Sequence, residues 1–189
     1  MNKLSILFTI FLLSFVLFIS YWLNNEVKRE LEIKEKKLSN SPDFFLKNFI
    51  SYRLDSEGNL NFKLQANTMK YYKHLNESLL GSPFYEDYKE NQLNLTIQSE
   101  NGKISDEGEK IDLINNVLLK RVELENKKEM KLHTNNLTLL PNKNIMLTKD
   151  NVKMIQEPSI EIDGIGLKYD KAEGLIKILK NTHVVYDAK

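Results

Sequence analysis

The sequence contains no cysteine, which excludes disulfide bonds and thiolate metal sites. Glycine and proline are scarce, with 7 and 4 copies in 189 residues, so a collagen-like or low-complexity chain is also excluded. Charge of one sign does not dominate, because 27 Lys and Arg offset 26 Asp and Glu. The resulting net charge of +1 provides no electrostatic basis for binding nucleic acid. The length suffices for one domain with its own core.

Motifs of the common enzyme classes are also absent. The sequence has no G-x-S-x-G, no phosphate-binding loop and no H-E-x-x-H. His74, His133 and His183 are far apart and lack the spacing of zinc ligands. The acidic residues of Asp106–Asp112, around Gly108, could form a calcium loop, but their spacing favours an acidic turn. A carboxylate pair for glycoside hydrolysis stays open, yet nothing selects one pair. We expect neither an enzyme nor a cofactor.

One long uncharged run stands out at the N-terminus. Residues Leu4–Leu23 contain no charged side chain and, as a helix, would span roughly the 30 Å of a bilayer core. Tyr21 and Trp22 lie at the end of the run, where aromatic rings favour the head-group layer. A cleaved signal peptide is the alternative, although the run is long for one and no A-x-A-like site follows. The pattern predicts a transmembrane helix over residues 4–23, after a short tail at residues 1–3.

The residues that follow the run are densely charged. Glu30 with Lys34 and Glu32 with Lys36 have the i,i+4 spacing of helix-stabilising pairs. This predicts a charged helical stalk over residues 24–41, and a docking helix is the alternative. Basic residues are far more numerous after the uncharged run than before it, so a count of positive charges would place the C-terminal body in the cytoplasm, and charge alone does not support an exported body.

After Pro42 the apolar residues recur with a period of two, which predicts β-strands. Leu60, Phe62 and Leu64 alternate with polar residues, and residues 55–58 form the turn of a predicted hairpin. Similar runs continue to the end of the chain. The segment 67–80 fits least well and could hold a short turn of helix.

One phrase occurs three times, as LINNVLLKR from Leu113, LTKDNVKMI from Leu147 and LKNTHVVYD from Leu179. In each copy, turn-forming residues separate two alternating runs, and such a break marks a strand that kinks or turns a corner. Strand pairs of this kind build a sandwich, a jelly roll or a β-solenoid. We expect an all-β domain over residues 42–189, most consistent with an open jelly roll.

The start of this domain resembles the LptC family, whose members are lipopolysaccharide export proteins. The stretch SPDFFLKNFISYRLDSEGNLNFKLQANTMKYY fits the family's Pro-Asp-aromatic start, its D-x-x-G-x-L-x-[YF]-x-L-x-A strand and its Tyr-rich end. The matching positions are Pro42, Asp43, Phe44, Asp55, Gly58, Leu60, Phe62, Leu64, Ala66, Tyr71 and Tyr72.

Later motifs follow in the family's order. The family's A-x-x-G…L-x-G-N-V segment resembles SENGKISDEGEKIDLINNV in this chain. Its L-x-T-x-x-L-x-[VL]-x-P segment resembles LHTNNLTLLPNKNIMLTKDNVKM. Its G-x-G-[LM] segment resembles IDGIGLKYDKAEGLIKIL. Asn115 stands where the family usually has Gly, which could alter the local bend. The resemblance covers nearly the whole chain.

The resemblance implies a location and a task. It implies an inner-membrane helix with a cytoplasmic N-terminus, and an open jelly-roll or β-taco-like domain in the periplasm. Such a domain receives lipopolysaccharide from an inner-membrane ABC transporter and passes it to the bridge protein LptA. A membrane-anchored β-domain that binds only protein partners is the alternative.

Inward-facing residues of such a domain would line a trough for acyl chains, although they could equally fill a closed core. The candidate lining residues are Phe62, Leu64, Leu95, Ile97, Val117, Leu132, Leu137, Leu139, Val152, Ile162, Leu167 and Tyr169. By the resemblance, the last strand would pair edge to edge with the next protein through Val184, Val185 and Tyr186.

Overall fold

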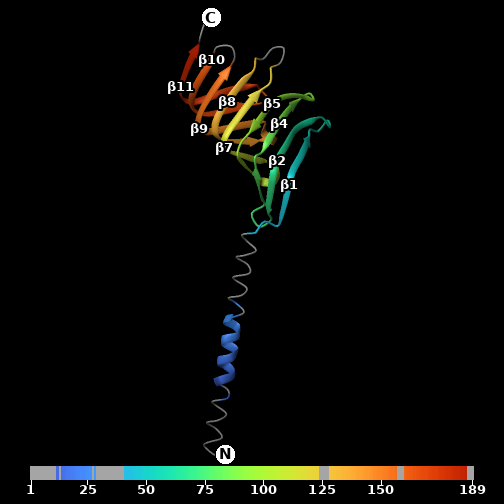
Figure 1. Cartoon of the computed structure of the whole chain (residues 1–189), viewed down its shortest axis with the longest axis vertical. Coiled ribbons are helices and arrows are strands. Elements are labelled where there is room, and N and C mark those ends of the chain that lie inside the picture. The colour runs from blue at the N-terminus through green and yellow to red at the C-terminus, as the bar shows by residue number, and fades with distance from the viewer. Residues whose placement is uncertain are drawn as a thin grey trace, which may run out of the picture. The chain divides into compact units, whose positions relative to one another are not determined.

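The computed structural model describes residues 12, 14–26, 28, 41–123, 128–156 and 160–186. The chain divides into two units, Met1–Pro42 and Asp43–Lys189. In the first unit, residues 14–26 are helical (Figure 1). Over the ranges just given, no helix is both long and apolar enough to cross a membrane. Much of the predicted transmembrane helix and most of the predicted stalk lie outside the described residues, so both stay predictions.

The second unit is a single β-sheet of eleven strands (Figure 1). The strands are β1 (Phe44–Leu54), β2 (Leu60–Tyr72), β3 (Glu77–Gly81), β4 (Phe84–Lys89), β5 (Gln92–Gln98), β6 (Asn101–Ser105), β7 (Lys110–Arg121), β8 (Met130–Leu140), β9 (Ile145–Gln156), β10 (Ile160–Asp170) and β11 (Leu175–Tyr186). Two short 3-10 turns, η1 (Asp106–Gly108) and η2 (Pro141–Lys143), join strands. The all-β prediction is confirmed.

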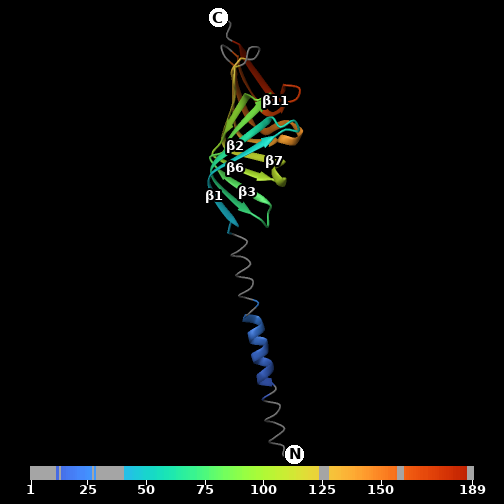
Figure 2. The same ribbon diagram turned by 90° about the vertical axis from the view of Figure 1, so that its right-hand side faces the viewer.

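All strand pairs are antiparallel, and most follow the order of the chain. Two long strands each pair with two short strands: β2 pairs with both β3 and β4, and β7 pairs with both β5 and β6. The short strands β3 and β4 therefore act as two halves of one interrupted strand, as do β5 and β6. In the described part of the chain, β1 pairs only with β2 and β11 only with β10, so these two strands form the ends of the sheet. Figure 1 shows them at opposite sides of the domain, and Figure 2 shows the same sheet after a quarter turn.

The interruptions of neighbouring strands are aligned, and we call this line across the sheet the crease. Backbone hydrogen bonds from Ser82 N to Glu100 O and from Glu100 N to Asn115 O join three of the interruptions. Residues with positive φ mark the crease in most strands, and they are Asn48, Ser82, Asn115, Asn116, Gly166 and Asn181. Residues 135–136 of β8 and 150–151 of β9 continue it where the strand register shifts.

The crease depends on residues that tolerate left-handed backbone. Asn adopts this conformation more readily than most side chains, and Gly has no Cβ to clash. The crease confirms that the Asn-containing breaks of the repeated phrases mark strand corners. It divides the sheet into two leaves, which we name the β4 leaf (with β4 and β5) and the β3 leaf (with β3 and β6). The longer strands run through both.

The two leaves enclose one hydrophobic core. Alternate residues of β7, such as Ile111 and Leu113 in the β3 leaf and Val117 and Leu119 in the β4 leaf, are at most 3 % exposed. A half-buried sheet shows such alternation when another layer covers one of its faces. The described strands form one sheet, so the layer that covers each leaf is the other leaf of the same sheet.

The predicted hairpin is confirmed, since β1 and β2 pair and residues 55–59 form their turn. The short helical turn suggested for residues 67–80 is wrong. Strand β2 continues to Tyr72, hydrogen bonds from Leu75 N to Tyr72 O and from Asn76 N to Lys73 O close a tight turn, and β3 follows. The pairing of β2 with both β1 and β3 stabilises the extended backbone there.

Candidate functional site

All twelve candidate lining residues face the interior. Eleven are buried, and Ile162 is partly buried against the same cluster. Leu95 and Ile97 of β5 come from the β4 leaf, while Leu137 and Leu139 of β8 come from the β3 leaf. The structure therefore brings residues from six strands together into a single apolar surface. Their contact with lipid stays a prediction.

The candidate set omitted ten other buried apolar residues on the same surface, although the period-two pattern could have found several of them. These are Ala66, Met69, Leu80, Tyr85, Ile111, Leu113, Leu119, Met130, Met146 and Met154. Four of the chain's five methionines are in this group. Methionine side chains are flexible and polarisable, so they adapt to changes in packing more easily than branched ones.

The interior is closed where the leaves meet. A hollow between Tyr85 of the β4 leaf and Leu139 and Met146 of the β3 leaf measures only about 10 Å³. That volume is near the lower limit for one water molecule and far too small for an acyl chain. Acyl chains could enter this part of the interior only if the leaves moved apart.

A polar cluster joins the leaves on the side opposite the crease, which we call the rim. Asp87 of β4 is fully buried, and its carboxylate accepts hydrogen bonds from Lys171 Nζ at 2.6 Å and from Asn94 Nδ2 at 2.9 Å. Lys171 also donates to Asn61 Oδ1 at 3.1 Å. Burial raises the pKa of Asp87 above its ordinary value, while the charge of Lys171 and the two hydrogen bonds partly counter that rise.

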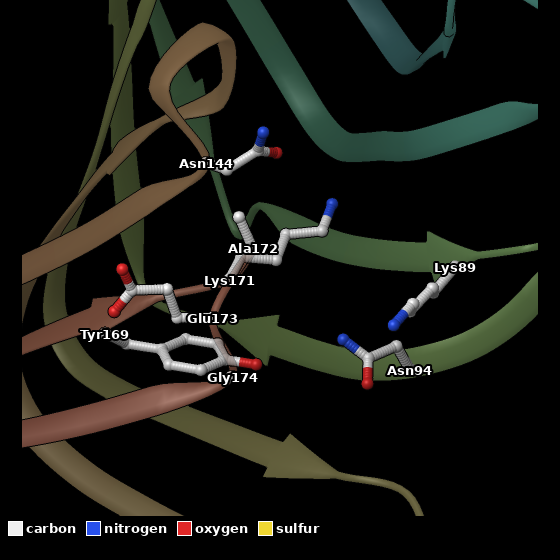
Figure 3. A pocket seen from close by; sticks show the side chains of 8 residues that line it. All are labelled: Lys89, Asn94, Asn144, Tyr169, Lys171, Ala172, Glu173 and Gly174. Atoms are coloured by element: carbon white, nitrogen blue, oxygen red, sulfur yellow. The ribbon is translucent and has the colours of Figure 1, made fainter.

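Lys171 belongs to the turn between β10 and β11, and its side chain contacts the β4 leaf at this point. Figure 3 shows residues of this turn facing Lys89 and Asn94 of the β4 leaf across a pocket. The pocket measures about 230 Å³, and Tyr169 and Asn144 also line it. Burial, followed by the negative charge of Asp87, raises the pKa of the Tyr169 hydroxyl.

A second polar link crosses the rim nearby. Arg53 Nη2 of β1 donates to Asn142 Oδ1 of η2 at 2.7 Å, and Asn142 Nδ2 donates to Glu109 Oε1 at 3.0 Å. The adjoining Asn144 carbonyl accepts a hydrogen bond from Lys171 N at 2.8 Å. Asn142 of η2 therefore forms one link, and Asn144, which follows η2, binds the backbone of the residue that forms the other.

Both ends of the sheet expose apolar side chains. On β11, the predicted contact residues Val184, Val185 and Tyr186 are 55 %, 50 % and 67 % exposed. On β1, Tyr52 and Leu54 are similarly exposed. Terminal strands with free edges can pair with a strand of another protein. Whether β11 does so stays a prediction.

The acidic residues considered for calcium have other surroundings. Asp106 and Glu107 form η1, whereas Asp112 accepts a hydrogen bond from Thr138 at 2.6 Å and pairs with Lys110 at 2.9 Å. Among the residues that the structure describes, no cluster of three or more His, Cys, Asp or Glu side chains could hold a metal ion.

Comparison with known proteins places this site in context. No curated protein sequence matches the chain significantly. The crystal structure of LptH from Pseudomonas aeruginosa, described as the LptA-homologous periplasmic component of the lipopolysaccharide transport device, is similar in fold. The TM-score is 0.54 at 11 % identity, over 67 % of this chain and 95 % of that one. Residues 10–187 match the family described as "Lipopolysaccharide-assembly, LptC-related", and the chain belongs to this family.

Proposed function

We propose that this chain is a non-enzymatic carrier of lipopolysaccharide. It receives the lipid from an inner-membrane ABC transporter and passes it to an LptA-type bridge protein on the way to the outer membrane. Membership of the LptC-related family supports this role, as does the fold shared with an LptA homologue. The observation that carries it is the single apolar surface between two leaves joined at only one side by continuous strands.

The energetics suit transfer rather than storage. Each acyl methylene removed from water contributes about 0.8 kcal/mol. The side chains that would contact the tails are already buried against each other, so lipid replaces existing contacts instead of covering exposed surface. The net affinity is then a small difference between two large terms, and the lipid can be released to the next protein.

We propose the following arrangement along the chain. Residues 1–3 lie in the cytoplasm, residues 4–23 span the inner membrane, residues 24–41 form a stalk, and residues 42–189 form the periplasmic domain. The exposed residues Val184, Val185 and Tyr186 pair edge to edge with the bridge protein, so that the two apolar surfaces become continuous.

The buried methionines offer a direct test of lipid binding. Photo-methionine in place of methionine puts a small diazirine at four interior positions, Met69, Met130, Met146 and Met154. We expect the full chain in detergent to crosslink to lipopolysaccharide upon irradiation. Intact lipopolysaccharide should compete for crosslinking, whereas deacylated lipopolysaccharide should not.

A matched control carries leucine at these four positions and retains Met1 alone. Leucine and methionine have similar volumes, so the control should fold. Equal labelling of the photo-methionine chain and this control would contradict lipid binding in the interior. The closed hollow beside Tyr85 would then favour the adaptor alternative, in which the domain binds only proteins.

A further inference from the structure

The ion pair between Asp87 and Lys171 differs from the others in what it connects. Among the ion pairs of the described residues, five join residues of one segment or of paired strands, such as Lys63 with Glu86. Asp87 and Lys171 are 84 residues apart and belong to different leaves. This pair is therefore the only ion pair across the rim within the described part of the chain.

Packing alone does not explain a charge at this position. Asp87 follows Tyr85 on the inner face of β4, and its side chain is fully buried. Apolar residues occupy most other inner positions, and well-packed apolar side chains often replace a buried ion pair without loss of stability. A polar contact, in contrast, can separate and become solvated on both sides when two surfaces part.

The route of an amphiphile passes this position. Its head group stays in water while its tails lie in the interior, so the molecule must straddle an opening between the leaves. The crease offers no such opening, because backbone strands run through it. The rim is the side where the leaves meet through side chains and turns.

We propose that Asp87 and Lys171 form a latch across the rim, and that the leaves separate at this latch when the acyl tails of an amphiphile enter or pass. The hydrogen bond between Arg53 and Asn142 is a second contact of the same closed rim. This inference rests on the proposed function and adds the place where the tails gain access to the interior.

The absence of cysteine permits a specific test. In an Arg53→Cys/Asn142→Cys variant, a short bifunctional methanethiosulfonate would bridge the rim while Asp87 and Lys171 stay unchanged. We expect bridging to reduce photo-methionine crosslinking to lipopolysaccharide by about tenfold or more, and reduction of the bridge to restore it. A Lys153→Cys/Glu161→Cys variant is the control, because this ion pair joins adjacent strands on one leaf. Bridging that control should leave crosslinking unchanged.

A second variant tests the latch without a crosslinker. Asp87→Leu combined with Lys171→Met removes both charges and leaves no unpaired one. Once circular dichroism confirms the fold, we expect lipopolysaccharide to load at least about threefold more slowly, because the two apolar side chains, unlike the ion pair, are not solvated favourably when the leaves part. Equal crosslinking of the bridged and reduced rim variants, with normal crosslinking overall, would overturn the latch but leave the proposed function standing. No crosslinking in any variant, including the unmodified chain, would overturn both.

Discussion

The side-chain amide of Asn136 on β8 donates a hydrogen bond to the carboxylate of Asp150 on β9, with 2.7 Å between Nδ2 and Oδ2. The backbone pairing between these strands is interrupted from Thr134 to Thr138. A side-chain hydrogen bond therefore links the two strands at the crease, where regular backbone hydrogen bonds are interrupted. We expect Asn136→Ala to lower the free energy of unfolding by about 1 kcal/mol. Asp150→Asn retains an acceptor oxygen and should change it much less. Urea denaturation measures both, and an equal loss in the two variants would show that the bond contributes nothing specific.

The conformation of Asn115 leads to a second prediction. Its φ is 64°, a region that costs a β-branched residue about 1–2 kcal/mol. We expect Asn115→Val to destabilise the domain by about that amount, whereas Asn115→Gly should be nearly neutral because glycine adopts this φ freely. Thermal unfolding of both variants provides the measurement. A valine variant as stable as the glycine variant would contradict a left-handed corner in β7.

Burial of the interior can be tested on one strand. Ile97 is 0 % exposed, whereas its neighbour Thr96 points away from the core and is partly exposed. We expect Ile97→Ala to cost about 2–5 kcal/mol through lost burial and the remaining cavity. Thr96→Ala should stay within about 0.5 kcal/mol, as do most surface substitutions. Chemical denaturation of the two variants compares them, and similar losses would mean that β5 does not present its odd-numbered residues to the core.

The raised pKa of Asp87 predicts a dependence of stability on pH. The folded protein binds a proton at Asp87 more tightly than the unfolded chain, whose carboxyl has the ordinary value of 3.8. This group therefore contributes stability that is fully present below pH 3.8 and is lost as the pH rises through its folded pKa. Tyr85 and Tyr169 nearby have pKa values raised by burial and stay neutral in this range.

An Asp87→Asn variant removes this titration. We expect the stability of the wild type minus that of the variant to decrease as the pH rises from about 3.5 to 7. Urea denaturation of both proteins across this range provides the measurement. A difference that increases with pH would show that Lys171 favours the charged carboxylate by more than burial disfavours it.

The free edge of β11 leads to a prediction about partner binding. A lysine at an edge strand discourages pairing with another strand because its charge must be desolvated. We expect Val184→Lys to weaken binding of an LptA-type protein by about tenfold or more, measured by biolayer interferometry. Leu54→Lys on the opposite edge is the control and should leave this binding unchanged. Equal weakening in both variants would argue against a contact specific to β11.

Sequence reasoning succeeded where the signal is local. The alternation of apolar and polar residues predicted that Leu95 and Ile97, and ten further residues, share one face, because strand geometry alone places every second side chain there. The Asn-containing breaks indicated the corners for a similar reason, since left-handed backbone is a property of individual residues. The 3-10 turn η2 was not predicted.

Contacts between distant segments could not be predicted in this way. Asp87 alternates with Tyr85 and so lies on the inner face, but a lone Asp in a strand ordinarily indicates a surface position. Its partner Lys171 is in a turn, where lysine is common. Only the folding of one leaf onto the other brings the two together, and periodicity carries no information about that step.

Across the crease, the inward-facing residues of a strand need not keep the same odd or even numbering. In β7 the inward residues are odd-numbered on both sides, whereas in β8 they change from even, as in Leu132, to odd, as in Leu137. A residue inserted within a half-strand would turn its apolar face outward, but one inserted at the crease would only lengthen the corner. Homologous chains should therefore differ in length at the crease without disturbing the core, and alignments across it should be anchored separately in each half.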